Sequence, residues 1–265
     1  MTALYDRQAG VIRQGRGEKV PQGHALPGRW WLLALPLAIV AALVGVTWFA
    51  PDDRDDIVGT HLAGARGPEP VNFVFLMDRS GSFVAYDQVR EEALRQVLTW
   101  APRNLRDDDT LTVITFADDA VLTLPWTTVG QINSGTAVSQ AAPNPSGTRI
   151  VPALEMANHQ LPAAANTSVV ALTDTAIYDG SDPRIASLLG DLDVATISVL
   201  IPDGTPIEPS WATAFPNQVV FNVDSTDTSA VSLAFGQAVA HGTGQQLNAN
   251  QWYDNLADWF SRLWS

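Results

Sequence analysis

Short apolar segments alternate with amphipathic segments over residues 70–242. Segments such as 71–77 (VNFVFLM) and 194–201 (VATISVLI) are almost wholly apolar, which is typical of strands buried on both faces of a sheet. Other segments, such as 86–101, place apolar residues at helical spacing. The alternation predicts an α/β fold, a doubly wound and mostly parallel six-stranded sheet with helices on both faces. We expect strands at 71–77, 111–117, 121–126, 168–173, 194–201 and 219–223, and helices at 86–101, 150–161, 182–192 and ending near 241.

Two residues are expected to end helices, and one segment gives no clear pattern. Pro102 follows the helix at 86–101, and Gly242 follows the last predicted helix, where we expect it to form the cap. Residues 127–147 carry Gly, Ser and Pro and are interpreted only as a long loop.

A segment near the N-terminus is longer and more apolar than any predicted strand. Residues 30–50 (WWLLALPLAIVAALVGVTWFA) contain 21 residues and no charge. As a helix they would span roughly 31 Å, the thickness of a bilayer's hydrocarbon core. Tryptophans lie at both ends of the segment, where the membrane interface favours them. We therefore expect a transmembrane helix at 30–50, with a cleaved signal peptide and a buried soluble helix as the alternatives.

The charge distribution predicts how this helix is oriented. Residues 1–29 carry five basic and two acidic residues, a net charge of +3, whereas the rest of the chain carries −16. Because basic flanks stay in the cytoplasm, we expect 1–29 to be a cytoplasmic tail. We then expect residues 51–69 to be a linker and the remaining residues to form a domain outside the cytoplasm. The protein would cross the membrane once.

Composition excludes several functions. The net charge of −13 and the pI of about 4.5 disfavour binding to nucleic acids, whose phosphates are also negative. The chain has no cysteine, so it has no disulfide, thiolate metal site or cysteine nucleophile.

Polar residues follow two of the predicted buried strands. The sequence DRSGS places Asp78, Ser80 and Ser82 directly after the first strand, and Asp174 follows the strand at 168–173. Thr148 lies in SGTRI, just before a predicted helix. The carboxyl ends of the strands in an open α/β sheet are where ligands bind. On its own, DRSGS is equally well explained as a turn that caps the next helix.

The five side chains offer only oxygen atoms, two carboxylates and three hydroxyls. If the strands bearing Asp78 and Asp174 are neighbours, these oxygens converge on one point. Such a set suits a hard cation, Mg²⁺ in particular, with Mn²⁺ or Ca²⁺ as alternatives.

The motifs D-x-S-x-S, SGT and LTD, in this order and on these elements, resemble the von Willebrand factor type A (vWA) family. The resemblance covers about residues 70–242. Within the family, the chain resembles a bacterial member that is anchored in the membrane. It implies a Rossmann-like sheet with strand order 3-2-1-4-5-6, in which the short third strand is antiparallel at the edge and the strands bearing Asp78 and Asp174 are adjacent. The five residues would form the family's metal-ion-dependent adhesion site (MIDAS). Thr175 stands where the family often has glycine, and the family's second helix is not evident within 127–147.

The resemblance also implies a function. The domain would bind a protein partner through Mg²⁺, with an Asp or Glu of that partner completing the metal's coordination, and would not be an enzyme. A further possible partner is a membrane complex of which the chain is one subunit. Arg79 and Arg149 flank the site and either attract such an anion or are surface charges. The alternatives are a structural sheet domain of an envelope complex without metal-dependent binding, and a Mg²⁺-dependent hydrolase.

The segment after the predicted domain, 243–265, is expected to contain an amphipathic helix. Within 248–265, Trp252, Leu256, Trp259 and Leu263 share one helical face. This face packs on the chain's own domain, binds a partner or lies on a membrane surface.

Overall fold

The computed structural model describes residues 56–133, 135–162 and 166–249. The predicted cytoplasmic tail and transmembrane helix lie outside these residues, as does 250–265 of the predicted C-terminal helix. Within the described ranges, no helix is both long and apolar enough to cross a bilayer. The chain divides after Pro51, and all the described elements belong to one compact unit, Asp52–Ser265.

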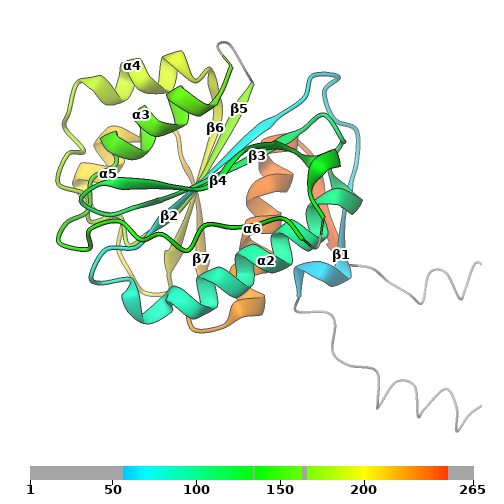
Figure 1. The fold of residues 1–265 in the computed structure, drawn as a ribbon, viewed down its shortest axis with the longest axis horizontal. Helices are drawn as coiled ribbons and strands as arrows, with labels where there is room; N and C mark the ends of the chain where they lie inside the picture. Colours follow the sequence, from blue (N-terminus) through cyan, green and yellow to red (C-terminus); the bar gives the residue numbers. More distant parts are fainter. Residues whose placement is uncertain (1–55, 134, 163–165, 250–265) are drawn as a thin grey trace, which may run out of the picture. The chain divides into compact units, whose positions relative to one another are not determined.

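Six strands form one mixed sheet in the order β4-β3-β2-β5-β6-β7, in which only β4 is antiparallel to its neighbour (Figure 1). This is the predicted order, with the predicted antiparallel strand at the edge. The strands are β2 (Asn72–Asp78), β3 (Thr110–Phe116), β4 (Ala120–Thr128), β5 (Thr167–Leu172), β6 (Val194–Pro202) and β7 (Val219–Val223).

Helices cover both faces of this sheet, as the alternating pattern predicts. Phe73, Phe75 and Met77 pack with α2 and α6 on one face, whereas Val74 and Leu76 pack with α3, α4 and α5 on the other. Every residue of β2 is buried, because its alternate side chains enter two different cores. The helices are α2 (Asp87–Asn104), α3 (Val151–Gln160), α4 (Arg184–Asp191), α5 (Pro209–Ala214) and α6 (Thr228–Thr243), and the short 3-10 helices are η2 (Ile57–Gly59), η3 (Val84–Tyr86) and η4 (Val129–Gln131).

The helix end expected from Pro102 is wrong by three residues, and the cap expected at Gly242 is wrong by two. Helix α2 continues through Pro102 to Asn104, and Leu105 N still donates to Ala101 O at 2.8 Å. Gly244, with φ of 71°, caps α6 in the left-handed conformation. Gly242 is needed inside the helix instead, because a Cβ there would lie 2.4 Å from Ser168 Oγ.

Part of the expected linker is folded onto the domain. Strand β1 (Thr60–Ala63) pairs antiparallel with β8 (Gln246–Ala249), and Thr60 O accepts a hydrogen bond from Trp100 Nε1 at 3.0 Å. Strand β8 also includes the first residues of the segment expected to be helical. The folded domain therefore extends on both sides of the predicted range 70–242.

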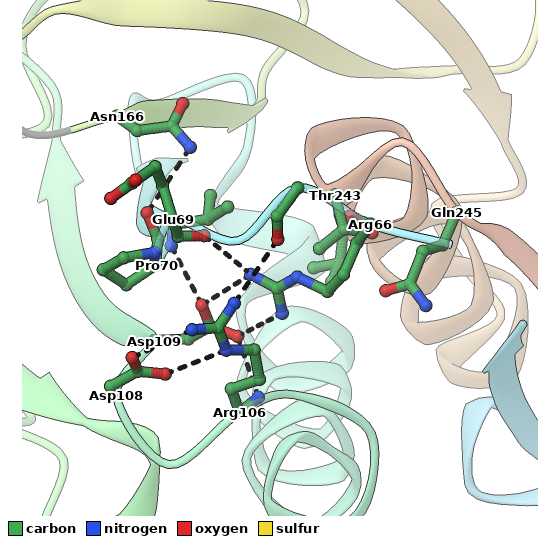
Figure 2. Close-up of polar contacts among 12 residues, drawn as sticks. Arg66, Glu69, Pro70, Arg106, Asp108, Asp109, Asn166, Thr243 and Gln245 are labelled. Carbon is green, nitrogen blue, oxygen red and sulfur yellow. Dashed lines mark hydrogen bonds and ion pairs between the residues drawn. The ribbon is translucent and has the colours of Figure 1, made fainter. Parts of the chain in front are cut away.

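A buried carboxylate holds in place the segment that leads into β2, the first strand of the main sheet. The side chain of Asp109 is fully buried and accepts hydrogen bonds from both terminal nitrogens of Arg66, at 2.6 and 2.8 Å (Figure 2). It also accepts from the backbone N–H of Val71 and of Arg106. Burial acts to raise the pKa of Asp109, but these hydrogen bonds outweigh burial and hold the pKa below its usual value. Asp109 thus ties the segment before β2 to the turn before β3.

The predicted long loop contains no α-helix where the structure describes it. After η4 the chain runs as coil from Ile132 to Arg149, with Ser134 outside the described residues. The family's second helix is therefore replaced by coil over this segment, which passes beside α2 (Figure 1).

Candidate metal centre

The sheet brings the two predicted aspartates to one edge. Strands β2 and β5 are parallel neighbours, with Met77 opposite Leu172. Asp78 is the last residue of β2, and Asp174 follows the end of β5 by two residues. The carboxyl ends of both strands therefore face the same side of the domain, as the sequence predicts.

Three of the predicted residues are in direct contact. Ser82 Oγ donates to Asp174 Oδ2 at 2.6 Å, although the two residues are 92 positions apart in sequence. Ser82 Oγ is also 3.1 Å from Ser80 Oγ. Ser80 is buried and Ser82 is exposed. Their oxygens form a row from the interior to the surface, ending at Asp174.

Asp78 lies beneath this row and is fully buried. Its Oδ1 accepts from Ser80 N at 2.8 Å, and its Oδ2 accepts from Thr173 Oγ1 at 2.6 Å. Burial raises the pKa of Asp78, the hydrogen bonds from Thr173 and Ser80 act against this, and the negative charge of Asp174 raises it further. A cation beside Asp78 would relieve this cost of burying a negative charge.

Thr173 is a functional contact that sequence reasoning missed. Its hydroxyl orients Asp78, as described above, and accepts from Thr175 N at 3.0 Å. The available signal was a hydroxyl residue directly before Asp174 on the strand next to Asp78. Only the pairing of β2 with β5 shows that the hydroxyl reaches Asp78.

Thr148 is placed close to the site without a side-chain contact to it. Pro145, in the same loop, accepts from Gly81 N of the DRSGS turn at 3.2 Å. The side chain of Thr148 is buried, and its hydroxyl forms no hydrogen bond with any described residue. Its carbonyl accepts from Tyr178 N at 2.9 Å. The structure therefore joins Ser80, Ser82 and Asp174 directly, Asp78 through Ser80, and Thr148 only through its loop.

The two flanking arginines differ in their surroundings. Arg79 forms ion pairs with two acidic residues of α2, Asp87 at 2.9 Å and Glu91 at 3.6 Å. Arg149 donates its backbone N–H to Ala117 O. Arg90, which the sequence did not single out, is buried and donates to Asp78 O at 2.7 Å, fixing the end of β2.

Thr175 adopts the conformation that glycine would favour. Its φ is 67°, in the left-handed region. A β-branched residue is strained there, at a cost of about 1–3 kcal/mol. Thr175 is buried, and its hydroxyl accepts from Glu208 N at 3.0 Å. Glycine has no side chain to accept this hydrogen bond, which offsets part of the strain next to Asp174.

The donor atoms fit a hard divalent cation. The row offers hydroxyl and carboxylate oxygens only, the ligands that Mg²⁺ prefers. No group of three or more His, Cys, Asp or Glu side chains in the described ranges is arranged to hold a metal. A metal here would therefore depend on the serine and threonine hydroxyls as well as on the two aspartates.

Comparison with known proteins supports the fold. Residues 73–176, from β2 through the segment after β5, match the family model for the von Willebrand factor type A domain. A von Willebrand factor type A structure from Catenulispora acidiphila is 20% identical over 70% of this chain and 48% of its own, with a TM-score of 0.51.

Proximal thread matrix protein 1 from the mussel byssus is 19% identical over 74% of this chain and 49% of its own, with a TM-score of 0.49. Another structure of that mussel protein, described as having a zinc-occupied MIDAS motif, is 13% identical over 66% of this chain and 48% of its own, with a TM-score of 0.46. The chain thus spans about half the length of these structures. A search of the curated proteins found no match. The family match over residues 73–176 and the observed strand order agree, and the described domain has the von Willebrand factor type A fold.

Proposed function

We propose that this domain binds a protein partner through a divalent cation, with Mg²⁺ as the expected ion. The observation that carries the proposal is the row of oxygens from Ser80 through Ser82 to Asp174 above the buried Asp78. Asp78, Ser80, Ser82, Thr148 and Asp174 would hold the ion. Bound there, the ion supplies positive charge for a carboxylate of the partner, an Asp or Glu, which completes its coordination.

The surface around the site supports a protein partner. Among the described residues, four large apolar side chains are exposed. Two of them flank the site, since Val84 (51% exposed) follows Ser82 by two residues and Tyr178 (78% exposed) donates its N–H to Thr148 O. Exposed apolar side chains next to a polar centre would give a protein ligand apolar contacts in addition to the metal.

Metal-dependent capture tests this function. The fragment 52–265 would be immobilised and exposed to solubilised membranes of the source cells in Mg²⁺ or in EDTA. We expect specific proteins to be retained in Mg²⁺ and released by EDTA, and not to be retained by Asp174→Asn. Asp191→Asn, an exposed aspartate at the end of α4, serves as the matched control and should behave as the wild type. Equal recovery in Mg²⁺ and EDTA would contradict the proposal.

We also propose that residues 30–50 anchor the chain in the membrane, with the domain outside the cytoplasm. The support is the uncharged 21-residue segment that follows the basic tail. Protease added to intact spheroplasts should digest the domain and spare residues 1–29. A domain that stays protected would show that the orientation is wrong, and a mature chain that starts after Ala50 would show that the segment is a cleaved signal.

A further inference from the structure

A cavity of about 660 Å³ lies beside α2, and none of the five candidate metal ligands lines it, although Arg79 of the DRSGS turn does. One wall is α2, and the opposite wall is formed by residues of the coil after η4, namely Ile132, Asn133, Thr136, Val138, Ser139 and Gln140. This coil stands where the family's second helix was expected. The cavity is therefore formed in part by a loop of this chain and not by that helix. Its volume is in the range of sites that hold small molecules, about 300–1,000 Å³.

The inner part of the cavity is apolar. Met77 of β2, Leu94 and Leu98 of α2, and Ile132 and Val138 of the coil line it. Leu94, Leu98, Met77 and Ile132 also belong to the buried core on this face of the sheet, so their positions are fixed by packing. The cavity therefore offers a rigid apolar surface to a ligand.

The charged residues that line the cavity are mostly basic. They are four arginines and one glutamate, in a chain whose net charge is −13. Arg79 and Arg90 are paired with Asp87, and Arg95 is paired with Glu92. Arg103 forms no ion pair or hydrogen bond with any described residue. One guanidinium at the cavity is thus available to an external anion.

Apolar and basic groups are spread along one helix. Leu94 and Leu98 are one turn apart on α2, and Arg103 lies in its last turn. From Leu94 to Arg103 the helix rises about 14 Å. A flexible apolar chain lying against the two leucines would place an anionic group at its end near Arg103.

We propose that this cavity binds a single-chain amphiphile with an anionic head group, of the class of medium-chain fatty acids. The apolar chain occupies the inner part of the cavity, and the carboxylate pairs with Arg103. The proposal does not depend on a metal at Asp78, so it stands or falls separately from the proposed function.

Titration of the fragment 52–265 with dodecanoate in EDTA tests the proposal. All described elements lie within this unit, and EDTA excludes metal soaps and any effect of the metal centre. We expect saturable binding of one dodecanoate per chain. Dodecyltrimethylammonium, which has the same tail and the opposite charge, should bind at least tenfold more weakly.

Two variants locate the binding. Arg103→Glu reverses the charge at an exposed position and should weaken binding at least tenfold, and Leu98→Trp should do the same by filling the cavity. Arg184→Glu, on α4 and on the other face of the sheet, should leave binding unchanged. Circular dichroism would confirm that each variant is folded, and Arg103→Glu suffices if Leu98→Trp does not fold. A folded wild type that binds no dodecanoate, or binding that Arg103→Glu leaves unchanged, would overturn the proposal.

Discussion

We expect Asp78→Ala to abolish measurable Mg²⁺ binding by the fragment 52–265 in a calorimetric titration. Asp78 carries one of the two negative charges of the proposed site and is fully buried beneath the serine hydroxyls. Removing it takes away both a charge and the acceptor that orients Ser80. Because burial makes the charged form of Asp78 costly, the ion-free fold should survive its loss.

Three further variants complete this test. Thr148→Ala removes a neutral donor and should weaken binding less than Asp78→Ala. Asp174→Asn, at a half-buried position, should lose binding as Asp78→Ala does, which keeps the test valid if the buried substitution disturbs the fold. Asp191→Asn should bind like the wild type. Wild-type affinity in folded Asp78→Ala and Asp174→Asn would place the ion elsewhere.

The largest loss of stability should come from Asp109→Asn. Asp109 accepts two hydrogen bonds from Arg66 and two from backbone N–H groups while its side chain is fully buried. Breaking a fully buried ion pair costs about 3–5 kcal/mol, and because Arg66 is only partly buried we expect a loss at or below the lower end of that range. Urea unfolding of the fragment 52–265 measures this change in the free energy of unfolding.

The neighbouring residue provides the control. The side chain of Asp108 is 56% exposed, so Asp108→Asn should change the free energy of unfolding by no more than about 0.5 kcal/mol. Equal effects of the two substitutions would show that the Arg66–Asp109 pair does not stabilise the fold.

The same pair predicts how acid affects stability. The pKa of Asp109 is lower in the folded state than in the unfolded chain. Its contribution is therefore fully present above the ordinary carboxyl pKa of about 3.9 and is lost as the pH falls through the lower folded value. The difference in stability between wild type and Asp109→Asn should shrink in this acidic range. A difference that stays constant down to about pH 2 would contradict the assigned pKa direction.

The sequence alone predicts the sheet well because its signal is local. Each buried strand is a short apolar run, and the residues after Met77 and Thr173 are the polar ones that a ligand-binding edge requires. Parallel pairing then follows from the alternation of strands and helices. The adjacency of β2 and β5 was implied by the resemblance to the vWA family and not by the local pattern, and with that adjacency the approach of Asp174 to the DRSGS turn was expected.

Other features depend on contacts that no local pattern encodes. Strands β1 and β8 have four residues each, and each pairs with a partner at the other end of the domain. Such short strands have no periodicity of their own, so β1 was predicted as linker. The contact between Thr173 and Asp78 and the glycine required at position 242 likewise arise only once β2, β5 and α6 are packed together.

One measurement tests the central claim most directly, the titration of wild-type fragment 52–265 with Mg²⁺ and with Mn²⁺. We expect saturable binding of one ion per chain, because the site offers two carboxylates and neighbouring hydroxyls at a single edge of the sheet. Circular dichroism and a cooperative thermal transition would establish that the fragment is folded. A folded fragment that binds neither ion would contradict metal-dependent partner binding and would favour a purely structural role for the domain.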